Sequence, residues 1–300
     1  MDLRRLEVLR AVAERGGVAA AARALHCTPS AVSQQLKVLQ REAGAALTER
    51  DGRGIRLTPA GAELARRAVD VAVALRRAEA ACAEHQSLPT GTVTVAAFQS
   101  AAQMLLPGLL TRLRSEPGIT VVLSDDDVAQ DQFAGLTSDA DIVIAHRPDR
   151  TVAWGEAVRC VPLLREPLDV AVPPGHRLAG RAGIEPRDLR GERWIAVREG
   201  FPVAAVLAAV GRSAGEVPVV AHRINDFHVA EALVAAGHGI SLLPRFTADD
   251  RDGQRFGMVP LEGVRAGREI DALLRPDRAE RVVVRRVLDA LVAEANDLVG

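Results

Sequence analysis

A row of polar side chains on one face of a short helix is the first feature of this sequence that could do chemistry. Residues 28–39 read TPSAVSQQLKVL. At 100° per residue, the hydroxyl, carboxamide and cationic groups fall together on Ser30, Ser33, Gln34, Lys37 and Arg41. Hydroxyl and carboxamide groups can hydrogen-bond to base edges in a major groove, and cations can contact phosphates. The face therefore fits double-stranded DNA, with a plain solvated helix surface as the alternative.

The helix that carries this face needs a defined start and a packed back. Thr28 can serve as its N-cap, and Pro29 can take the first helical position, where a missing N–H costs nothing. The opposite side is apolar, and two further helices are predicted before it, over about 3–15 and 18–25. We expect the apolar side to pack on these two helices.

A basic hairpin follows the third helix. The segment LTERDGRGIRLTPAG, residues 47–61, contains two Gly turn signals between short apolar pieces, which predicts a β-hairpin. An arginine at the tip of such a hairpin can reach into the minor groove. Three helices and a basic hairpin form a winged helix-turn-helix. The candidate DNA-binding residues are Thr28, Pro29, Ser30, Ser33, Gln34, Lys37, Arg50 and Arg53.

The distribution of charge agrees with this interpretation. Residues 1–60 hold ten basic and six acidic side chains, a balance of +4, and the rest of the chain holds 28 and 33, a balance of −5. A basic front end on an acidic body indicates nucleic-acid binding at the front. The three cysteines lie far apart and have no metal-ligand spacing, and no apolar run is long enough to cross a bilayer. With no signal peptide at the N-terminus either, we expect a cytoplasmic protein without disulfides, bound metal or membrane contact.

A long helix with one apolar stripe is predicted from Pro59 to about Gln86. Its stripe steps by four and three residues through Leu64, Ala68, Val71, Leu75, Ala78 and Cys82. Such a heptad seam is typical of a helix that pairs with a second copy of itself. Packing against the chain's own body is the alternative.

Strands and helices alternate beyond a hinge at residues 87–93. Val-rich and Ile-rich runs such as TVTVAAF (92–98), ITVVL (119–123) and ADIVIA (140–145) are separated by helical patterns. Continuous apolar strands between helices indicate an α/β fold with a mostly parallel sheet.

The chain resembles the LysR-type transcriptional regulators. The match in the first 61 residues runs through Ala21-Ala22, Leu25, Ser33, Leu36, Leu39, Gly44, Leu47, Arg50, Leu57-Thr58 and Gly61. The segments at 162–180 and 233–245 are similar to the effector domain of that family, which has the fold of periplasmic solute-binding proteins. The resemblance implies a winged helix-turn-helix domain over 1–58, a dimerising linker helix with a hinge over 59–90, and a two-lobe effector domain over 91–300. Lobe one would take 91–162 and 267–300, and lobe two 163–266. It also implies a homodimer through the linker helix and a homotetramer of two dimers.

The cleft between the two lobes is the expected ligand site. Gln99 and Ser100 follow a strand and open a helix, where free N–H groups and the helix dipole favour an anion. We therefore expect a small-molecule effector that carries a carboxylate. The candidate effector-binding residues are Phe98, Gln99, Ser100, Ala145, His146, Arg198, Phe201, Phe227 and His228.

Each of these residues also has a simpler interpretation. Ser100 could be a helix cap, and His146, Arg198 and His228 could be ordinary surface or internally satisfied residues. The run Asp125 to Asp127 could receive an amine, although a solvated acidic loop is the favoured interpretation.

The sequence shows no catalytic motif. There is no GxSxG elbow, P-loop, HExxH pair or GxGxxG turn after a strand, so we expect neither an enzyme nor a cofactor. The predicted function is a sequence-specific transcriptional regulator modulated by a small molecule. The alternative is a winged-helix protein-interaction module fused to a small-molecule-binding domain, without operator binding.

Overall fold

The computed structural model describes residues 1–52, 54–83, 89–148, 154–155 and 157–299. The chain divides into two compact units. Unit 1 comprises residues 1–89 and 275–285, and unit 2 comprises residues 90–274 and 286–300.

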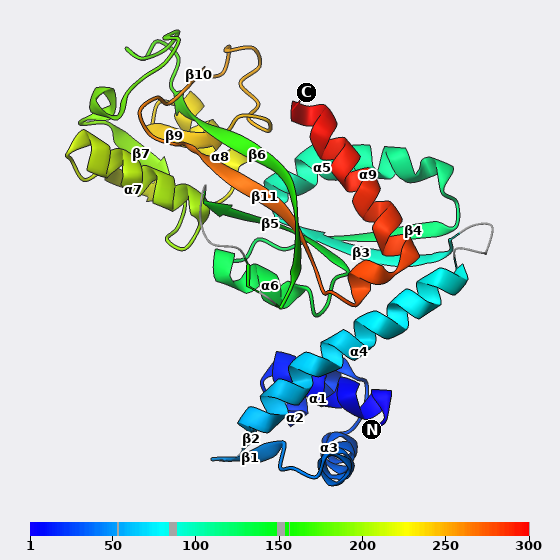
Figure 1. Cartoon of the computed structure of the whole chain (residues 1–300). Helices are drawn as coiled ribbons and strands as arrows, with labels where there is room; N and C mark the ends of the chain where they lie inside the picture. The colour runs from blue at the N-terminus through cyan, green and yellow to red at the C-terminus, as the bar shows by residue number, and fades with distance from the viewer. Residues whose placement is uncertain (53, 84–88, 149–153, 156, 300) are drawn as a thin grey trace. The chain divides into compact units, whose positions relative to one another are not determined.

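Unit 1 begins with three short helices, α1 (Leu3–Arg15), α2 (Val18–Ala24) and α3 (Pro29–Ala43) (Figure 1). The Thr28 side chain accepts a hydrogen bond from the backbone N–H of Ala31 at 3.2 Å, so it caps α3 as predicted. The helix ends at Gly44, which adopts a left-handed conformation with φ 66°. The start expected for this helix is confirmed.

The apolar sides of the three helices meet in one core. Val32, Leu36 and Leu39 of α3 are buried there. The rest of the core comes from the neighbouring helices, the start of the hairpin and the next long helix: Leu6, Leu9, Ala11, Val12, Ala21, Ala22, Leu47, Ala65 and Ala68. The polar face of α3 is therefore turned away from the core.

The predicted hairpin consists of β1 (Thr48–Asp51) and β2 (Gly54–Leu57), which pair antiparallel. Helix α4 (Pro59–Ala83) follows. It comes very close to the hairpin at Gly61, where an added Cβ would lie 2.0 Å from the backbone oxygen of Leu47. Glycine is thus required at this joint between the wing and the long helix.

The predicted seam of α4 has two halves. Leu64 and Ala68 pack into the core of unit 1, so for this half the alternative, packing against the chain's own body, holds. Val71 and Leu75 remain 40% and 41% exposed, and Ala78 and Cys82 are exposed as well. A face that can pair with a second copy is therefore left only on the C-terminal half.

Unit 2 is built on one curled sheet. In the described residues, its strand order is β4-β3-β5-β11-β6-β9-β7-β8, and β10 also pairs with β6. The strands are β3 (Gly91–Ala97), β4 (Ile119–Asp125), β5 (Ile142–Pro148), β6 (Arg159–Val172), β7 (Arg193–Ala196), β8 (Val219–Arg223), β9 (Ile240–Pro244), β10 (Gly257–Val259) and β11 (Gly267–Leu274).

Helices cover this sheet. They are α5 (Gln99–Arg112), α6 (Phe133–Leu136), α7 (Pro202–Ala214), α8 (Phe227–Ala235) and α9 (Val282–Val299), whose first four residues belong to unit 1. Short 3-10 turns lie at Leu113–Ser115, Gln130–Gln132, Pro186–Leu189 and Arg278–Glu280. No helix in the described ranges combines the length and apolar character needed to cross a membrane.

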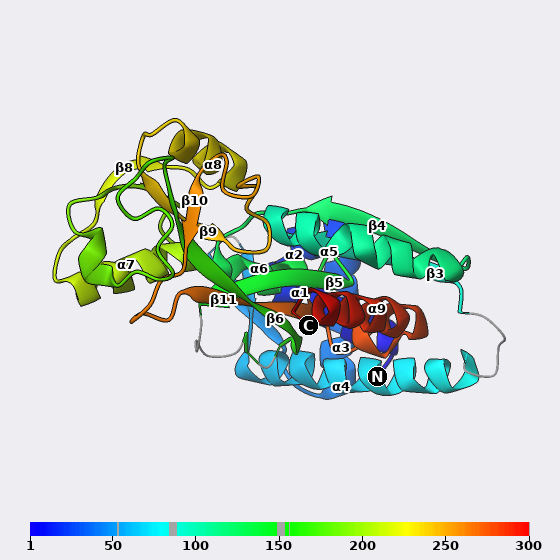
Figure 2. The same ribbon diagram turned by 90° about the horizontal axis from the view of Figure 1, so that it is seen from above.

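Two strands connect the two halves of unit 2. Strand β3 pairs parallel with β4 and β5 in one half, and β7 pairs parallel with β8 and β9 in the other. Strands β6 and β11 run antiparallel side by side and pass from one half to the other (Figure 2). The predicted two-lobe α/β architecture is confirmed, and β6 and β11 are the strands that connect the lobes.

Candidate functional sites

The polar face of α3 is exposed. Ser30, Gln34 and Lys37 are exposed and Ser33 is partly so, while the apolar side of the same helix is buried. The Ser33 hydroxyl donates to the backbone oxygen of Pro29 at 2.9 Å, a bond that a base edge could replace. No hydrogen bond or ion pair in the described residues holds the side chains of Gln34 and Lys37. These two side chains are free to contact a partner.

The wing beside this face carries the predicted arginines. Arg50 is exposed on β1, whereas Arg53 lies outside the described residues. Arg56 forms an ion pair with Glu49 across the hairpin at 2.9 Å, so its charge is partly neutralised within the wing. Arg50 is thus the described wing arginine that keeps its charge available.

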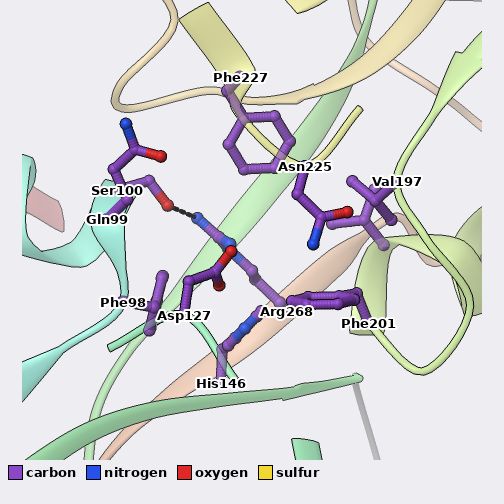
Figure 3. A pocket seen from close by; sticks show the side chains of 11 residues that line it. Phe98, Gln99, Ser100, Asp127, His146, Val197, Phe201, Asn225, Phe227 and Arg268 are labelled. Atoms are coloured by element: carbon purple, nitrogen blue, oxygen red, sulfur yellow. Dashed lines mark hydrogen bonds between the residues drawn. The ribbon is translucent and has the colours of Figure 1, made fainter. Parts of the chain in front are cut away.

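The second candidate site is an open pocket in unit 2, with about 350 Å³ of empty space when the solvent at its mouth is included (Figure 3). Residues from both lobes line it. Six of the predicted effector-binding residues are among the lining residues: Phe98, Gln99, Ser100, His146, Phe201 and Phe227. The other lining residues are Asp127, Val197, Val203, Asn225 and Arg268.

Helix α5 points its N-terminus at this pocket. Its N-cap residue is Phe98, which provides no side-chain cap. The first backbone bond of the helix is donated by Ala102 to the Phe98 oxygen at 2.9 Å, so the N–H groups of Gln99 and Ser100 precede the hydrogen-bonded turns. Donors at such a helix start favour a negatively charged or carbonyl oxygen.

Arg268 lies at the centre of the pocket and was missed by sequence reasoning. It is 1% exposed, and its guanidinium donates to the Glu166 carboxylate through Nε at 2.9 Å and Nη2 at 2.6 Å. Nη2 also donates to the Ser100 hydroxyl oxygen at 2.6 Å (Figure 3). Glu166 is fully buried. The two buried charges therefore neutralise each other, which is the condition under which such charges are tolerated.

Aromatic rings surround this pair. The Arg268 guanidinium lies 4.8 Å from the Phe98 ring centre and 5.7 Å from that of Phe227. The His146 ring lies 4.2 Å from the Phe98 ring. Burial, together with the positive charge of Arg268, holds the pKa of His146 well below its ordinary value, so the imidazole is neutral.

Three predicted residues are not among those lining the pocket. Ala145 is fully buried in β5, where it pairs with Asp271. Arg198 is exposed, and its backbone N–H donates to the Asn225 side-chain oxygen at 2.9 Å. His228 is half exposed and lies 3.7 Å from the carboxylate of Glu231.

Asp127 and Asn225 are further pocket residues that the sequence did not single out as binding residues. Asp127 is exposed on the loop after β4. Enclosure by the pocket nevertheless raises the pKa of its carboxyl group, and the positive charges of Arg268 and Arg198 oppose this effect only in part. The sequence signal for Asp127 was a three-aspartate run, which a solvated loop explains equally well.

Comparisons with known proteins identify the family of the domains that carry these two sites. Residues 3–62 match the family model for bacterial regulatory helix-turn-helix proteins of the lysR family, and residues 86–296 match the LysR substrate binding domain. The chain is 28% identical over 281 residues to the transcriptional dual regulator GltC of Bacillus subtilis, covering 93% of this chain and 92% of that protein. It is 30% identical over 283 residues to the regulator ClcR of Pseudomonas putida, covering 92% and 94%.

A solved structure extends this likeness to a complex with DNA. In the crystal structure of full-length CbnR with its target DNA, the CbnR chain is 25% identical to this chain and superposes with a TM-score of 0.52. The match covers 98% of this chain and 100% of CbnR. These relatives are transcriptional regulators, which favours DNA binding over a protein-interaction module. The chain belongs to the LysR family of transcriptional regulators, and joins a helix-turn-helix DNA-binding domain to an effector-binding domain.

Proposed function

We propose that operator binding by this regulator is controlled by a small carboxylate held between the lobes of unit 2. The observation that carries the proposal is the bond from Arg268 to the Ser100 hydroxyl oxygen. Because Ser100 accepts this bond, its own hydroxyl hydrogen remains to be donated. A polarised hydroxyl group beside the free N–H groups of a helix start is well suited to a carboxylate oxygen.

A ligand in this pocket contacts both lobes. Gln99 and Ser100 belong to lobe one, and Phe201 and Asn225 to lobe two. A ligand that touches both has more contacts when the lobes are closed, so it favours the closed form by the difference in affinity. That difference is what can couple effector binding to DNA binding.

On the DNA side, we propose that Ser33 and Gln34 read base edges. Thr28, Pro29 and Ser30 approach the DNA at the start of the same helix, Lys37 and Arg50 contact phosphates, and Arg53 reaches the minor groove. The exposure of the α3 face and the absence of internal partners for Gln34 and Lys37 in the described residues support this division.

We also propose a homotetramer assembled through two kinds of interface. Unit 1 exposes Val71 and Leu75 on α4. Unit 2 separately exposes Val122 on β4 and Val219 on β8, the two outermost strands of its sheet. Exposed apolar side chains on each of the two units fit an assembly of two dimers, which needs more than one interface, better than a single dimer. We further propose that the DNA-binding domain ends at residue 58, that the linker helix and hinge run to residue 90, and that the protein is cytoplasmic.

The experiment compares Ser100→Ala with Ser213→Ala, an exposed serine on α7 that does not line the pocket. Small carboxylates are screened by the shift they cause in the melting temperature of the wild-type protein, and the best ligand is then titrated. Ser100→Ala should weaken its binding by ~1–3 kcal/mol through loss of a charge-assisted hydrogen bond, and leave operator binding intact. Ser213→Ala should match the wild type. Equal affinity of the wild type and Ser100→Ala would show that Ser100 only positions Arg268.

A further inference from the structure

We propose that the effector is a zwitterion: close to its carboxylate it carries an ammonium group, which pairs with Asp127. The ligand class is then an α-amino acid or a compound with the same headgroup. This inference rests on the proposed carboxylate site at Ser100 and adds a second charged contact to it.

The first step is that Arg268 does not supply the pocket with a free positive charge. Its guanidinium donates two hydrogen bonds to Glu166, and both side chains are withdrawn from solvent. The pair is neutral as a unit. Breaking it to bind a ligand anion would leave Glu166 buried without its partner, which is strongly unfavourable. The ligand's carboxylate therefore accepts hydrogen bonds from the α5 N-terminus and the Ser100 hydroxyl group. It does not replace Glu166 as the partner of Arg268.

The second step concerns Asp127, the acidic residue among those that line the pocket. No ion pair is formed by its carboxylate in the described residues. The Asn225 side chain is its hydrogen-bonding neighbour, and Asn225 is itself oriented by the backbone N–H of Arg198. The charges of Arg268 and Arg198 offset the partial dehydration of this carboxylate only in part, so a ligand cation would stabilise it further. The pocket thus offers an anion site and a cation site.

The third step concerns the distance between the two ligand charges. Strands β3 and β4 are parallel neighbours, with Ala97 opposite Asp125, and the Asp126 N–H donates to the Ala97 oxygen at 2.9 Å. Gln99, the first residue of α5, and Asp127, on the loop after β4, follow two residues after this pair, and both line the pocket. The anion site and the cation site thus lie at the same edge of the sheet, so the two charged groups of the ligand should be close together. An α-amino acid headgroup meets this condition.

The rest of the ligand is met by apolar side chains. Val197, Phe201, Val203 and Phe227 line the pocket from lobe two. An aliphatic or aromatic substituent would lie against them, while the headgroup stays on lobe one. The expected ligands are apolar amino acids rather than acidic or basic ones.

The test uses matched compounds on the full-length protein. The proteinogenic amino acids are first screened by melting-temperature shift. The strongest ligand is then titrated by calorimetry beside the carboxylate and the amine that each lack one of its charges; for phenylalanine these are 3-phenylpropanoate and phenethylamine. The variants are Asp127→Asn and, as a matched control, Asp131→Asn, an exposed aspartate outside the pocket.

The amino acid should bind the wild type and Asp131→Asn at least about 10-fold more tightly than either of its single-charge analogues, a preference of ~1.4 kcal/mol. Asp127→Asn should bind the amino acid and its carboxylate analogue about equally tightly. If the carboxylate alone binds the wild type as tightly, or if Asp127→Asn keeps the preference, the zwitterion is wrong while the carboxylate site stands. If no amino acid binds but other carboxylates do, the same conclusion holds. If no carboxylate of either kind binds, the proposed function fails as well.

Discussion

The DNA-binding face and the effector pocket are built in opposite ways. The face of α3 belongs to one helix of 15 residues, and in the described residues the exposed side chains of Gln34 and Lys37 on it have no internal partner. The pocket takes residues from segments as far apart in the sequence as Phe98 and Arg268, and the charge of its lining residue Arg268 is neutralised by buried Glu166. The DNA-binding face exposes side chains that can bond to a partner. The effector pocket is already held together by internal bonds, and a ligand has to fit it.

The largest expected effect tests the internal bonding of the pocket. Glu166→Gln removes the carboxylate from buried Arg268 and should lower the free energy of unfolding of unit 2 by ~3–5 kcal/mol, measured by urea denaturation. Operator binding measured well below the unfolding transition should change little, because the α3 face does not depend on this pair.

A double variant sharpens this test. Glu166→Met combined with Arg268→Met replaces both charges by apolar groups and should recover most of the lost stability. If the double variant is as unstable as Glu166→Gln, packing rather than unpaired charge is responsible.

The second prediction is that tight operator binding needs the dimer, whereas effector binding does not. Leu75→Asp places a charge on the exposed half of the α4 seam and should convert the protein to monomers in sedimentation experiments. Operator affinity should fall by about 100-fold, because two linked DNA-binding heads become independent. Effector affinity should stay within about 2-fold. Arg76→Ala, at the adjacent position, is the control. A monomeric wild-type protein on its operator would contradict this prediction.

The third effect tests whether the α3 face reads sequence. Gln34→Ala should reduce the discrimination between operator and random DNA by ~1–3 kcal/mol, measured by competition binding. Lys37→Ala should instead weaken binding to both DNAs alike, since a phosphate contact carries no sequence information. Equal effects of the two substitutions on both DNAs would remove Gln34 from the base-reading set.

The smallest effect concerns the cysteine in unit 2. Burial and the neighbouring Asp271 raise the pKa of the Cys160 thiol to about 11, so at neutral pH it stays protonated and reacts slowly with oxidants. Cys160→Ser should leave operator and effector binding unchanged, and peroxide treatment should not alter DNA binding by the wild type. An oxidant response that disappears in Cys160→Ser would show that this thiol is a sensor.

The two sites also differ in how far sequence alone could define them. The residue pattern predicted both faces of α3 and its Thr28 cap, because these depend on spacing within one helix. The junction between a strand and a helix at Gln99 and Ser100 was predicted from local sequence as well. Which residues meet across the sheet depends on strand order, and local periodicity does not contain it.

Arg268 and Glu166 show this most clearly. They are 102 residues apart in the sequence and become neighbours because β6 and β11 pair antiparallel, with Arg268 opposite Glu166. A charged residue within an apolar strand is a signal that something must neutralise it. The sequence offered many acidic residues and no rule for choosing one. Likewise, Asp127 became a pocket residue only through the alignment of β4 beside β3.

The burial of the Arg268–Glu166 pair has a practical consequence in terms of ionic strength. Added salt screens exposed charges at a distance of about 10 Å in 0.1 M solution and reaches buried pairs far less. Phosphate contacts made by exposed Lys37 and Arg50 weaken steeply as salt increases, because they depend on the release of counterions from DNA. The central charges of the pocket are sheltered and already paired, so the shape of the pocket should persist under conditions that strip the protein from its operator. Raising the salt concentration is therefore a way to separate the two activities in one unmodified protein. Effector binding can be measured at high salt on the protein free of DNA, and operator binding at low salt on the protein that already holds its effector.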